Sequence, residues 1–384
     1  MNKLIYLDYA STTPIDKRVL EKMNNYLTTK GLFGNSSSSN YLGRKTKNEI
    51  ENARIRIANI LGSKQEEIFF TSNATESINL AIKGIIYSYF NNKKKYIITS
   101  SMEHKAVLET CNFLKKLGIK IIYITNSNIG VLNLNLLKEK IINKTILVSV
   151  MHINNEIGTI NNIKNIGNIC KKKNVFFHVD ATQSIGKYSL NLKKMNIDLL
   201  SFSAHKFYGP KGIGVLYVKK KKPKIILTPL LHGGGQEKGL RSGTLATHQI
   251  IGMSTALIIA DNEIKKEKER IKILKKKFWN EIRNIPGIFL NGSFKNSSPY
   301  IINIGCKDIF NKILMLEMNN IIISSSSACN SNKYNTSHVL KSLGLTKELI
   351  QSSIRISFGR FTTEKEIIYL IKELHFFIKK IRQS

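Results

Sequence analysis

Hydrophobic and polar positions follow two alternating patterns between about residues 50 and 260. Short runs of β-branched and aromatic residues, which are typical of strands, alternate with longer amphipathic stretches, which are typical of helices. Helices are predicted at 49–61, 77–89, 106–117 and 163–172, and strands at 67–71, 96–99, 119–124, 145–149, 175–179, 199–203 and 214–218. This alternation predicts a largely parallel sheet covered by helices.

The pattern changes near residue 261. Residues 261–285 are charged and amphipathic throughout, so they predict one long helix that leads into a smaller domain of mixed strands and helices. We expect a large domain over residues 15–260, and a small domain formed by residues 1–14 and 261–384. No stretch approaches the roughly 20 apolar residues of a membrane span, and the N-terminus lacks the apolar core of a secretory signal.

The formal net charge is +34, because 60 lysines and arginines face 26 aspartates and glutamates. Proteins that bind nucleic acids often carry such a charge. Here the basic residues are mostly lysine, spread along the whole chain together with abundant isoleucine and asparagine, as an A/T-rich genome would encode. We therefore expect at most weak, non-specific association with nucleic acids.

The four cysteines lie far apart and form no CxxC pair. This spacing argues against a disulfide framework or a structural zinc site and favours a reducing compartment, so we expect the cytoplasm. Cys111 and Cys170 lie on apolar helix faces and Cys306 at a strand end, so these three are expected in the core. Cys329 differs, because it lies in a polar, serine-rich segment after an apolar run.

Polar residues follow several of the predicted strands. Asp180 comes after the strand at 175–179, and His205 and Lys206 come after the strand at 199–203. The polar segments 71–76, 103–104 and 154–156 follow three other strands. Because ligands bind at the carboxyl ends of parallel strands, we expect these side chains to converge on one site.

An aspartate and a lysine at adjacent strand ends suit pyridoxal phosphate. The amine of Lys206 can bond to the cofactor aldehyde, and Asp180 can keep the ring nitrogen protonated. The phosphate would lie at the helix N-terminus opened by Ala74 and Thr75, and His104 could stack on the ring. Each residue alone also suits a helix cap, an ion pair or a structural histidine, so the prediction depends on their joint arrangement.

Motifs along nearly the whole chain resemble the cysteine desulfurases of the NifS/IscS type, which are class V aminotransferase-like enzymes of fold-type I. The motifs are YLDYA at 6–10, FGN at 33–35, TSNATES at 71–77, EHKA at 103–106, MHINNEIG at 151–158, HVDATQS at 178–184, SAHKFYGPKG at 203–212, HGGGQE at 232–237, RSGT at 241–244, SSSSACN at 324–330 and SIRISFGR at 353–360. The resemblance implies an α/β fold with a mainly parallel seven-stranded sheet between helices, plus a smaller α+β domain. The sequence stops at Ser384, earlier than the family's usual C-terminal tail.

The resemblance also implies how pyridoxal phosphate is held. Lys206 would bind it covalently, Asp180 would pair with the ring nitrogen, and Gln183 would pair with the phenolic oxygen. The full cofactor-binding set is Ala74, Thr75, Asn155, Asp180, Gln183, Ser203, His205, Lys206 and Thr244. The implied phosphate ligands are Thr75, Ser203, His205 and, from the other subunit of a homodimer, Thr244.

The reaction implied by the resemblance converts L-cysteine to L-alanine. Asn155 and Arg355 would hold the substrate carboxylate, Arg355 through its two-pronged guanidinium. Lys206 would move the α-proton, and Cys329 would accept the sulfur as a persulfide. A free thiol has a pKa of about 8.5, so Cys329 needs activation, for which a protonated His104 is the candidate acid/base partner.

The implied role is sulfur supply for iron–sulfur cluster assembly, with tRNA thiolation as a further outlet. The expected partners are a second copy of the chain, an iron–sulfur scaffold protein and other sulfur acceptors. No metal is expected in the resting enzyme, although Cys329 could transiently share an iron–sulfur cluster with the scaffold. We expect residues 324–333 to be mobile, because the thiol of Cys329 must reach both the cofactor and the acceptor.

Three alternatives stay open. A related aminotransferase or a selenocysteine lyase would use the same fold and cofactor, but a transaminase needs no thiol at Cys329. A non-enzymatic basic binding protein would explain the charge, but it would need neither Lys206 nor Asp180 at a strand end.

Overall fold

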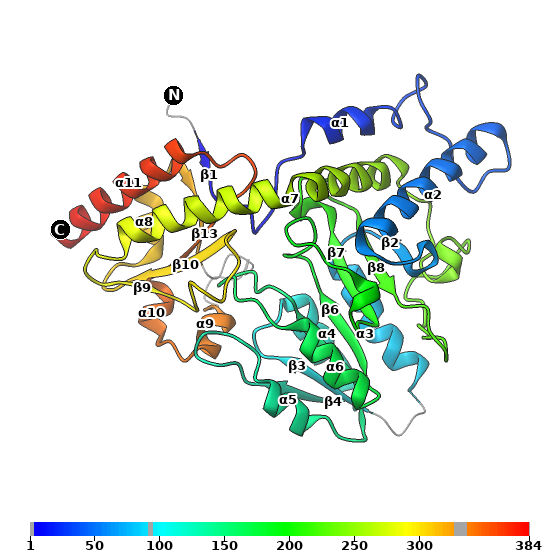
Figure 1. Ribbon diagram of the computed structural model, residues 1–384, viewed down its shortest axis with the longest axis horizontal. Coiled ribbons are helices and arrows are strands. Elements are labelled where there is room, and N and C mark those ends of the chain that lie inside the picture. Colours follow the sequence, from blue (N-terminus) through cyan, green and yellow to red (C-terminus); the bar gives the residue numbers. More distant parts are fainter. Residues whose placement is uncertain (1–3, 91–94, 326–335, 384) are drawn as a thin grey trace.

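The central element is a seven-stranded sheet, seen in a computed structural model that describes residues 4–90, 95–325 and 336–383 (Figure 1). Its strands, in spatial order, are β2 (Ile68–Thr71), β8 (Gly214–Val218), β7 (Leu199–Ser203), β6 (Phe176–Asp180), β5 (Thr145–Met151), β3 (Tyr96–Ser100) and β4 (Lys120–Ile124). Strand β8 is antiparallel to both of its neighbours, and the other pairs are parallel. The predicted mainly parallel seven-stranded sheet is therefore confirmed.

Helices pack on both faces of this sheet. They are α2 (Tyr41–Leu61), α3 (Ala74–Ser88), α4 (Lys105–Lys116), α5 (Leu134–Lys140) and α6 (Ile163–Lys172), while α1 (Lys17–Asn24) packs on the long helix at 247–282. The bounds of α6 agree with the prediction, but α2 and α3 begin earlier than predicted and α1 and α5 were missed. In both early starts an asparagine cap decides the position: Asn40 accepts a hydrogen bond from the Gly43 N–H, and Asn73 accepts one from the Glu76 N–H.

A second group of elements lies beside the first. An antiparallel sheet has the order β12 (Ser324–Ser325), β13 (Ser353–Ser357), β10 (Ile301–Cys306) and β9 (Ile288–Leu290). Its helices are α8 (Asn311–Glu317), α9 (His338–Ser342), α10 (Lys347–Gln351) and α11 (Glu364–Gln383). Near the N-terminus, β1 (Ile5–Tyr6) pairs in parallel with β11 (Ile321–Ile322), so the start of the chain joins this group (Figure 1).

One helix, α7 (Thr247–Ile282), runs along both groups (Figure 1). Its first half, including Ile250 and Leu257, belongs to the core under the large sheet. Its second half, including Ile271 and Phe278, belongs to the core of the second group. The predicted helix at 261–285 was therefore placed too late, since the apolar first half lacks the charge that marked the second. The predicted domain boundary after residue 260 falls inside this helix and stays a prediction.

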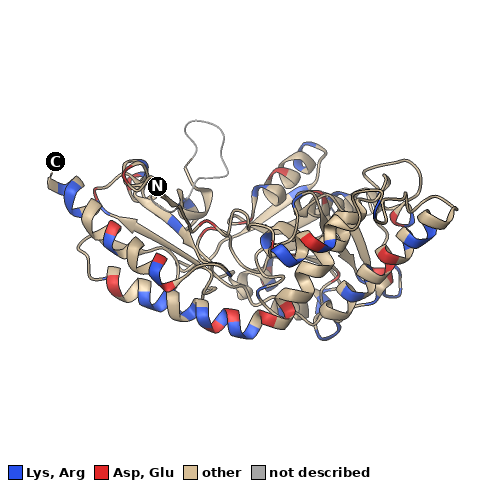
Figure 2. Cartoon of the chain, turned by 90° about the horizontal axis from the view of Figure 1, so that it is seen from above, with Lys and Arg blue, Asp and Glu red and all other residues tan. Residues whose placement is uncertain are grey.

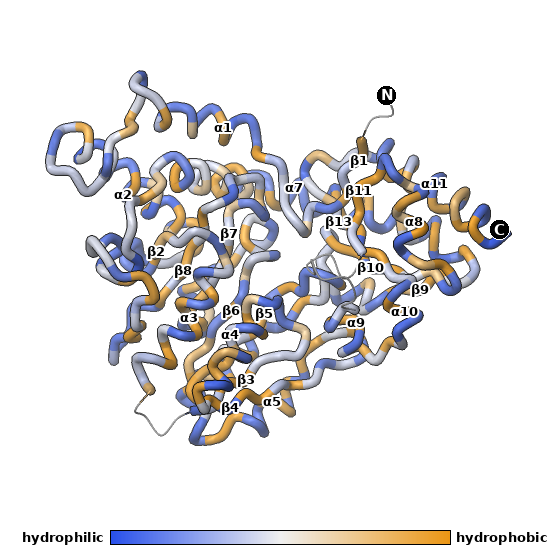
Figure 3. The backbone as a smooth tube through the Cα atoms, turned by 180° about the vertical axis from the view of Figure 1, so that it is seen from behind, coloured by the Kyte–Doolittle hydropathy of each residue, from blue (hydrophilic) through white to orange (hydrophobic). Residues whose placement is uncertain are grey.

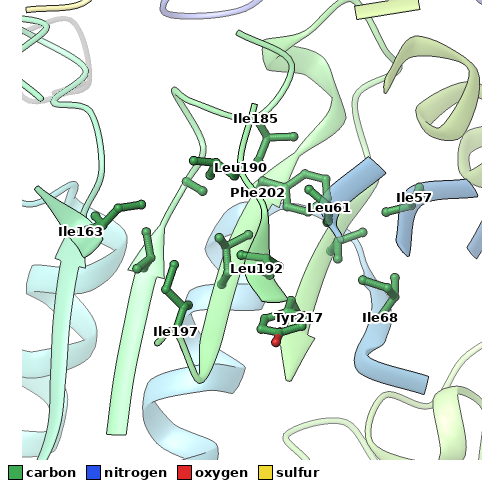
Figure 4. Close-up of a cluster of buried hydrophobic side chains, with 14 of the residues drawn as sticks. Ile57, Leu61, Ile68, Ile163, Ile185, Leu190, Leu192, Ile197, Phe202 and Tyr217 are labelled. Atoms are coloured by element: carbon green, nitrogen blue, oxygen red, sulfur yellow. The ribbon is translucent and has the colours of Figure 1, made fainter. Parts of the chain in front are cut away.

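Buried aliphatic and aromatic side chains fill both faces of the large sheet. Figure 4 shows part of one cluster, in which Leu61, Phe202 and Tyr217 lie among isoleucines. In the outer helices, buried apolar residues alternate with hydrophilic ones. In α11, Leu370 and Leu374 are buried, and hydrophilic residues lie between such positions (Figure 3). This one-sided burial is what the amphipathic pattern in the sequence indicates.

Three cysteines lie in these cores, as predicted. Cys111, Cys170 and Cys306 are all buried. Burial raises the pKa of the Cys111 thiol to about 12, and it raises the pKa of the other two thiols as well. These thiols are therefore protonated and poorly nucleophilic at neutral pH.

Lysine and arginine occur on helices and loops throughout the chain, with acidic residues among them (Figure 2). This spread agrees with the diffuse charge expected from the sequence. Among the residues that the structure describes, no helix combines the length and the apolar content needed to cross a membrane.

A buried ion pair connects α2 to the edge strand β2. Arg54 Nη2 lies 2.7 Å from Glu237 Oε1, and the two side chains are 7% and 1% exposed. Arg54 Nη1 also donates to the Ile68 carbonyl, and Glu237 Oε2 accepts from the Phe70 N–H. The guanidinium of Arg54 and the carboxylate of Glu237 thus have further hydrogen-bond partners besides each other. A buried ion pair needs such partners in order not to destabilise the fold.

We expect Glu237→Ala to lower the free energy of unfolding by about 3 kcal/mol, because it leaves the buried Arg54 guanidinium without its main counter-charge. Urea denaturation measures this change. Glu139→Ala is the control, since Glu139 pairs with Lys140 on the surface, and its removal should cost less than about 1 kcal/mol. Equal losses in both variants would contradict the role given to the buried pair.

Candidate active site

A cavity of about 240 Å³ lies where the loops after strands β5, β6 and β7 meet the start of α3. It is lined by Ala10, Ser11, Asn73, Ala74, Thr75, Ile78, His104, Met151, Ile153, Asn155, Asp180, Thr182, Gln183, His205, Lys206 and Arg355. The structure therefore brings most of the predicted site residues together. Ser203 and Thr244 are not part of this lining, and Cys329 lies outside the described residues.

Lys206 reaches the cavity from the short turn after β7. Its Nζ donates hydrogen bonds to two backbone carbonyls, Ala10 O at 2.8 Å and Ser11 O at 2.5 Å. Neither Ala10 nor Ser11 was predicted as a site residue, although the YLDYA motif ends at Ala10. An amine held at a known position beside a cavity can react with an aldehyde and can move a proton.

Asp180 is the last residue of β6 and is 5% exposed. Its Oδ1 accepts two hydrogen bonds from Thr182, one from the backbone N–H at 2.9 Å and one from the hydroxyl at 2.5 Å. Both bonds go to Oδ1, and no hydrogen bond to Oδ2 occurs among the described residues, so Oδ2 can accept from a donor in the cavity. A buried carboxylate of this kind can hold a protonated ring nitrogen.

A buried histidine on β6 connects the strand that carries Asp180 to both of its neighbours. His178 lies on β6 between two hydroxyls, Ser149 Oγ at 2.8 Å and Ser201 Oγ at 2.9 Å. Burial lowers the pKa of His178 to about 4, so its ring is neutral and serves the packing of the three strands.

The N-terminus of α3 opens onto the cavity. Asn73 caps it, and Ala74 and Thr75 are the first residues of this 15-residue helix. N–H groups in a first helical turn point away from the helix and favour an anion such as a phosphate. His205 lines the same cavity and bonds to Thr12 Oγ1 at 3.1 Å; burial, and then Lys206, lower its pKa to about 3. Burial and the nearby lysines thus favour the neutral ring of His205.

Two of the predicted phosphate ligands, Ser203 and Thr244, do not line the cavity of this chain. Ser203 is buried, and its hydroxyl donates to the Ile213 carbonyl at 3.2 Å. Thr244 is exposed. The prediction for Thr244 concerned the other subunit of a dimer, so a single chain leaves it untested.

His104 caps helix α4, where its Nδ1 accepts a hydrogen bond from the Ala106 N–H at 3.1 Å. Burial is the main cause that lowers its pKa, partly opposed by Asp180. The expected protonated state is therefore not the one that the site favours. Because Nδ1 is an acceptor, the neutral ring carries its proton on Nε2, and this N–H is the one that His104 can offer as an acid.

Arg355 enters the cavity from β13, in the second group of elements. Its Nη2 lies 2.7 Å from Asp8 Oδ1, and its Nη1 donates to the Asn155 carbonyl at 2.8 Å. Its Nε is buried and lacks a hydrogen-bond partner among the described residues. Asp8 was not predicted as a site residue, and it lies 347 positions away from Arg355 in the chain. A buried N–H without a partner fits the binding of a carboxylate beside this ion pair.

The chain on either side of residues 326–335 lies close to this site. Ser324 of β12 is paired with Arg355 in the sheet. On the other side, Ser337 donates to Glu156 Oε2 at 2.5 Å, and His338 Nε2 lies 2.8 Å from the Glu103 carbonyl. Both flanks therefore contact neighbours of cavity residues. The segment predicted to be mobile, 324–333, begins with Ser324 and Ser325, which the structure instead places in β12, paired with β13. The rest of that segment, including Cys329, lies outside the described residues.

The chemistry of this donor set fits pyridoxal phosphate. One cavity combines a lysine amine, a buried aspartate and a helix N-terminus, which match the aldehyde, the ring nitrogen and the phosphate of that cofactor. Gln183 adds an amide, which donates to the Ala10 carbonyl at 2.8 Å.

Comparison with known proteins matches the whole chain. The family model for aminotransferase class V covers residues 5–370. A protein named cysteine desulfurase IscS from Buchnera aphidicola subsp. Acyrthosiphon pisum (strain 5A) is 50% identical over 384 residues, which cover 100% of this chain and 95% of the relative. A protein of the same name from Photorhabdus laumondii subsp. laumondii is 47% identical over 380 residues, covering 99% and 94%.

Solved structures agree with these relatives. One described as a NifS-like protein has a TM-score of 0.90 at 37% identity and covers 99% of both chains. The NifS-like protein from Rickettsia africae ESF-5 has a TM-score of 0.86 at 29% identity, covering 98% of this chain and 99% of its own. With full-length matches in sequence and in structure, this chain belongs to the aminotransferase class-V family, among its cysteine desulfurases of the IscS type.

Proposed function

We propose that this chain is a pyridoxal-phosphate-dependent cysteine desulfurase, which converts L-cysteine to L-alanine and supplies the sulfur for iron–sulfur cluster assembly. The observation that supports this most is the single cavity that joins Lys206, Asp180 and the N-terminus of α3 to Arg355. An aminotransferase would need a similar set. The close relation to IscS-type proteins, together with the thiol of Cys329, favours the desulfurase.

Pyridoxal phosphate, when bound, supplies an aldehyde that reacts with amines and a ring that withdraws electrons. In this proposal Lys206 anchors it, and Asp180 holds a proton on the ring nitrogen. Thr75 and the first N–H groups of α3 bind the phosphate, with His205 beside them. The carbonyls of Ala10 and Ser11 keep the Lys206 amine in place until it is needed.

The substrate is held at the Arg355 side of the cavity. Its carboxylate accepts hydrogen bonds from the Arg355 guanidinium and from the Asn155 side chain, which lines the cavity. This contact turns the α-carbon toward Lys206, whose amine takes the α-proton. The His104 Nε2–H, on the same cavity wall, donates a proton where charge develops.

The sulfur then passes to Cys329. Its thiolate attacks the substrate sulfur, the carbon–sulfur bond breaks, and the carbon gains a proton, so the products are L-alanine and a persulfide on Cys329. Cys111, Cys170 and Cys306 do not compete, since each is buried with a raised pKa.

The assembly completes the proposal. We propose a cytoplasmic homodimer in which Thr244 of each chain binds the phosphate held by the other chain. Ser203, at the end of β7, is proposed to bind the phosphate of its own chain. Its partners are an iron–sulfur scaffold protein and other sulfur acceptors, including those for tRNA thiolation. The division into residues 15–260 and the remaining small domain is part of this proposal.

Lys206→Ala should abolish the conversion of cysteine to alanine, by at least about a thousandfold, because the same amine anchors the cofactor and moves the α-proton. Alanine formation and the cofactor absorption of the purified protein measure the effect. Lys116→Ala is the control, since Lys116 is exposed at the end of α4. A Lys206→Ala variant that turns over at the wild-type rate would refute the assignment.

Cys329→Ser should keep its cofactor and still bind cysteine but form no persulfide, because a hydroxyl is a far poorer nucleophile than a thiolate. Mass spectrometry after incubation with cysteine should find one added sulfur on the Cys329 peptide of the wild type and none in the variant. Cys306→Ser is the control and should retain the added sulfur. Sulfur on Cys111, Cys170 or Cys306 in the wild type would exclude the proposed role.

Arg355→Lys should raise the KM for L-cysteine about tenfold with a smaller change in kcat, because a lysine cannot present a planar fork to a carboxylate. Steady-state kinetics separate the two constants. Lys372→Arg, on α11 and away from the cavity, is the control. An unchanged KM would show that the carboxylate binds elsewhere.

A further inference from the structure

A second lysine lies buried directly behind the site. Lys187 is 4% exposed, although lysine is rarely buried without a partner. Its Nζ donates to Gln183 Oε1 at 3.1 Å and lies 5.6 Å from the centre of the Tyr300 ring. Burial lowers the pKa of Lys187 to about 7. The mechanism proposed above makes no use of this costly group, so its position needs a separate explanation.

The contacts of Gln183 determine which way its amide points. A carbonyl oxygen can only accept, so the group 2.8 Å from Ala10 O must be the amide nitrogen Nε2. The amide oxygen Oε1 then faces Lys187 and accepts its N–H. Two independent partners, one at each end of the amide, therefore select the same orientation.

This orientation decides what Gln183 offers to the cavity that it lines. An amide nitrogen carries two N–H groups, and Ala10 O takes one of them, so the second can be donated to a ligand. In the reversed orientation the side chain would present an acceptor instead. The same carbonyl, Ala10 O, also accepts from Lys206 Nζ at 2.8 Å, so a chain of hydrogen bonds runs from Lys187 through Gln183 and Ala10 to Lys206.

We propose that Lys187 is a positioning residue that holds the Gln183 amide with its nitrogen toward the cavity, where the N–H group not bonded to Ala10 O donates to the phenolic oxygen of bound pyridoxal phosphate. The proposal rests on the function proposed above, because it needs the cofactor. It assigns Lys187 no contact with substrate or cofactor; the lysine acts through Gln183.

The charged groups around Lys187 bear on any pH measurement. Lys206 and Arg355 lower its pKa, whereas Glu267 on α7 raises it. Tyr300 presents its ring face to the amine. A cation in this place also favours an anionic phenolic oxygen and a neutral Lys206 amine, so a test must separate this effect from the orientation of the amide.

The test is a pH titration of the cofactor absorption band in the purified holoenzyme. With Lys187→Met, Gln183 Oε1 loses its partner and only the Ala10 carbonyl still holds the amide, so the amide turns more readily and the phenolic oxygen loses its donor in the turned form. The proton shared between that oxygen and the Lys206 nitrogen is then kept to higher pH. We expect the midpoint to rise by about one pH unit, the size expected for one hydrogen bond to a charged group. The pyridoxal phosphate should also dissociate about tenfold more readily.

Lys275→Met is the matched control. Lys275 is also 4% exposed, burial lowers its pKa to about 7 as well, and its Nζ donates to Ser297 Oγ at 2.8 Å and to Ser298 O at 2.9 Å. It does not line the cavity. This variant should lose stability like Lys187→Met but leave the titration midpoint unchanged.

A double-variant cycle separates orientation from charge. In a Gln183→Ala background the midpoint should already be raised, and adding Lys187→Met should shift it no further. A full additional shift would show that Lys187 acts by its charge alone and would overturn the proposal. So would an unchanged midpoint in Lys187→Met.

If Lys187→Met does not fold, Lys187→Gln keeps a polar group in the buried site and takes its place. Its own amide can turn either way, so it no longer enforces the orientation of Gln183, and the midpoint should rise by a smaller amount. No rise would contradict the proposal. Failure of the underlying function is distinct, because the wild type would then bind no pyridoxal phosphate or Lys206→Ala would retain the lysine-bound absorption band.

Discussion

The backbone carbonyl of Ala10 is where the parts of the site meet. It accepts hydrogen bonds from Lys206, which follows β7, and from Gln183, which follows β6. The segment that carries it begins at β1, which pairs with β11 in the second group of elements, and continues through Asp8, which pairs with Arg355. One extended N-terminal segment therefore connects the residues that would hold the cofactor to the residue that would hold the substrate. Without it, Lys206 would lose both carbonyl partners, and Arg355 would lose its counter-charge.

The sheet and the strand-end residues could be predicted from the sequence because both depend on local patterns. A buried parallel strand has a short apolar run, and its carboxyl end faces the site, so Asp180 and Lys206 could be selected together as an acid and an amine at adjacent strand ends. The caps Asn40 and Asn73 explain why α2 and α3 begin earlier than the apolar period indicates. Both caps could have been found by looking for an asparagine just before each stretch in which apolar residues recur with the helical period.

Other contacts could not have been predicted in this way. The Asp8–Arg355 pair and the Ala10–Lys206 bond join positions 347 and 196 residues apart, and no local pattern carries that information. The neutral state of His104 follows from burial, which a sequence does not display. Lys187 looks like one more surface lysine among many in this basic chain, and only the packing around it shows that it is buried.

Helix α7 also has a mechanical consequence. It contributes side chains to both cores without interruption, and an α-helix resists bending because bending stretches its hydrogen bonds. Both cores are therefore attached to the same continuous helix, and a large rotation of one core relative to the other would require this helix to bend or break. Since Lys206 and Arg355 belong to opposite groups, this helix contributes, together with the N-terminal segment, to keeping the distance between them constant. The width of the cavity between Lys206 and Arg355, into which cofactor and substrate must fit, thus depends in part on a helix that does not line this cavity.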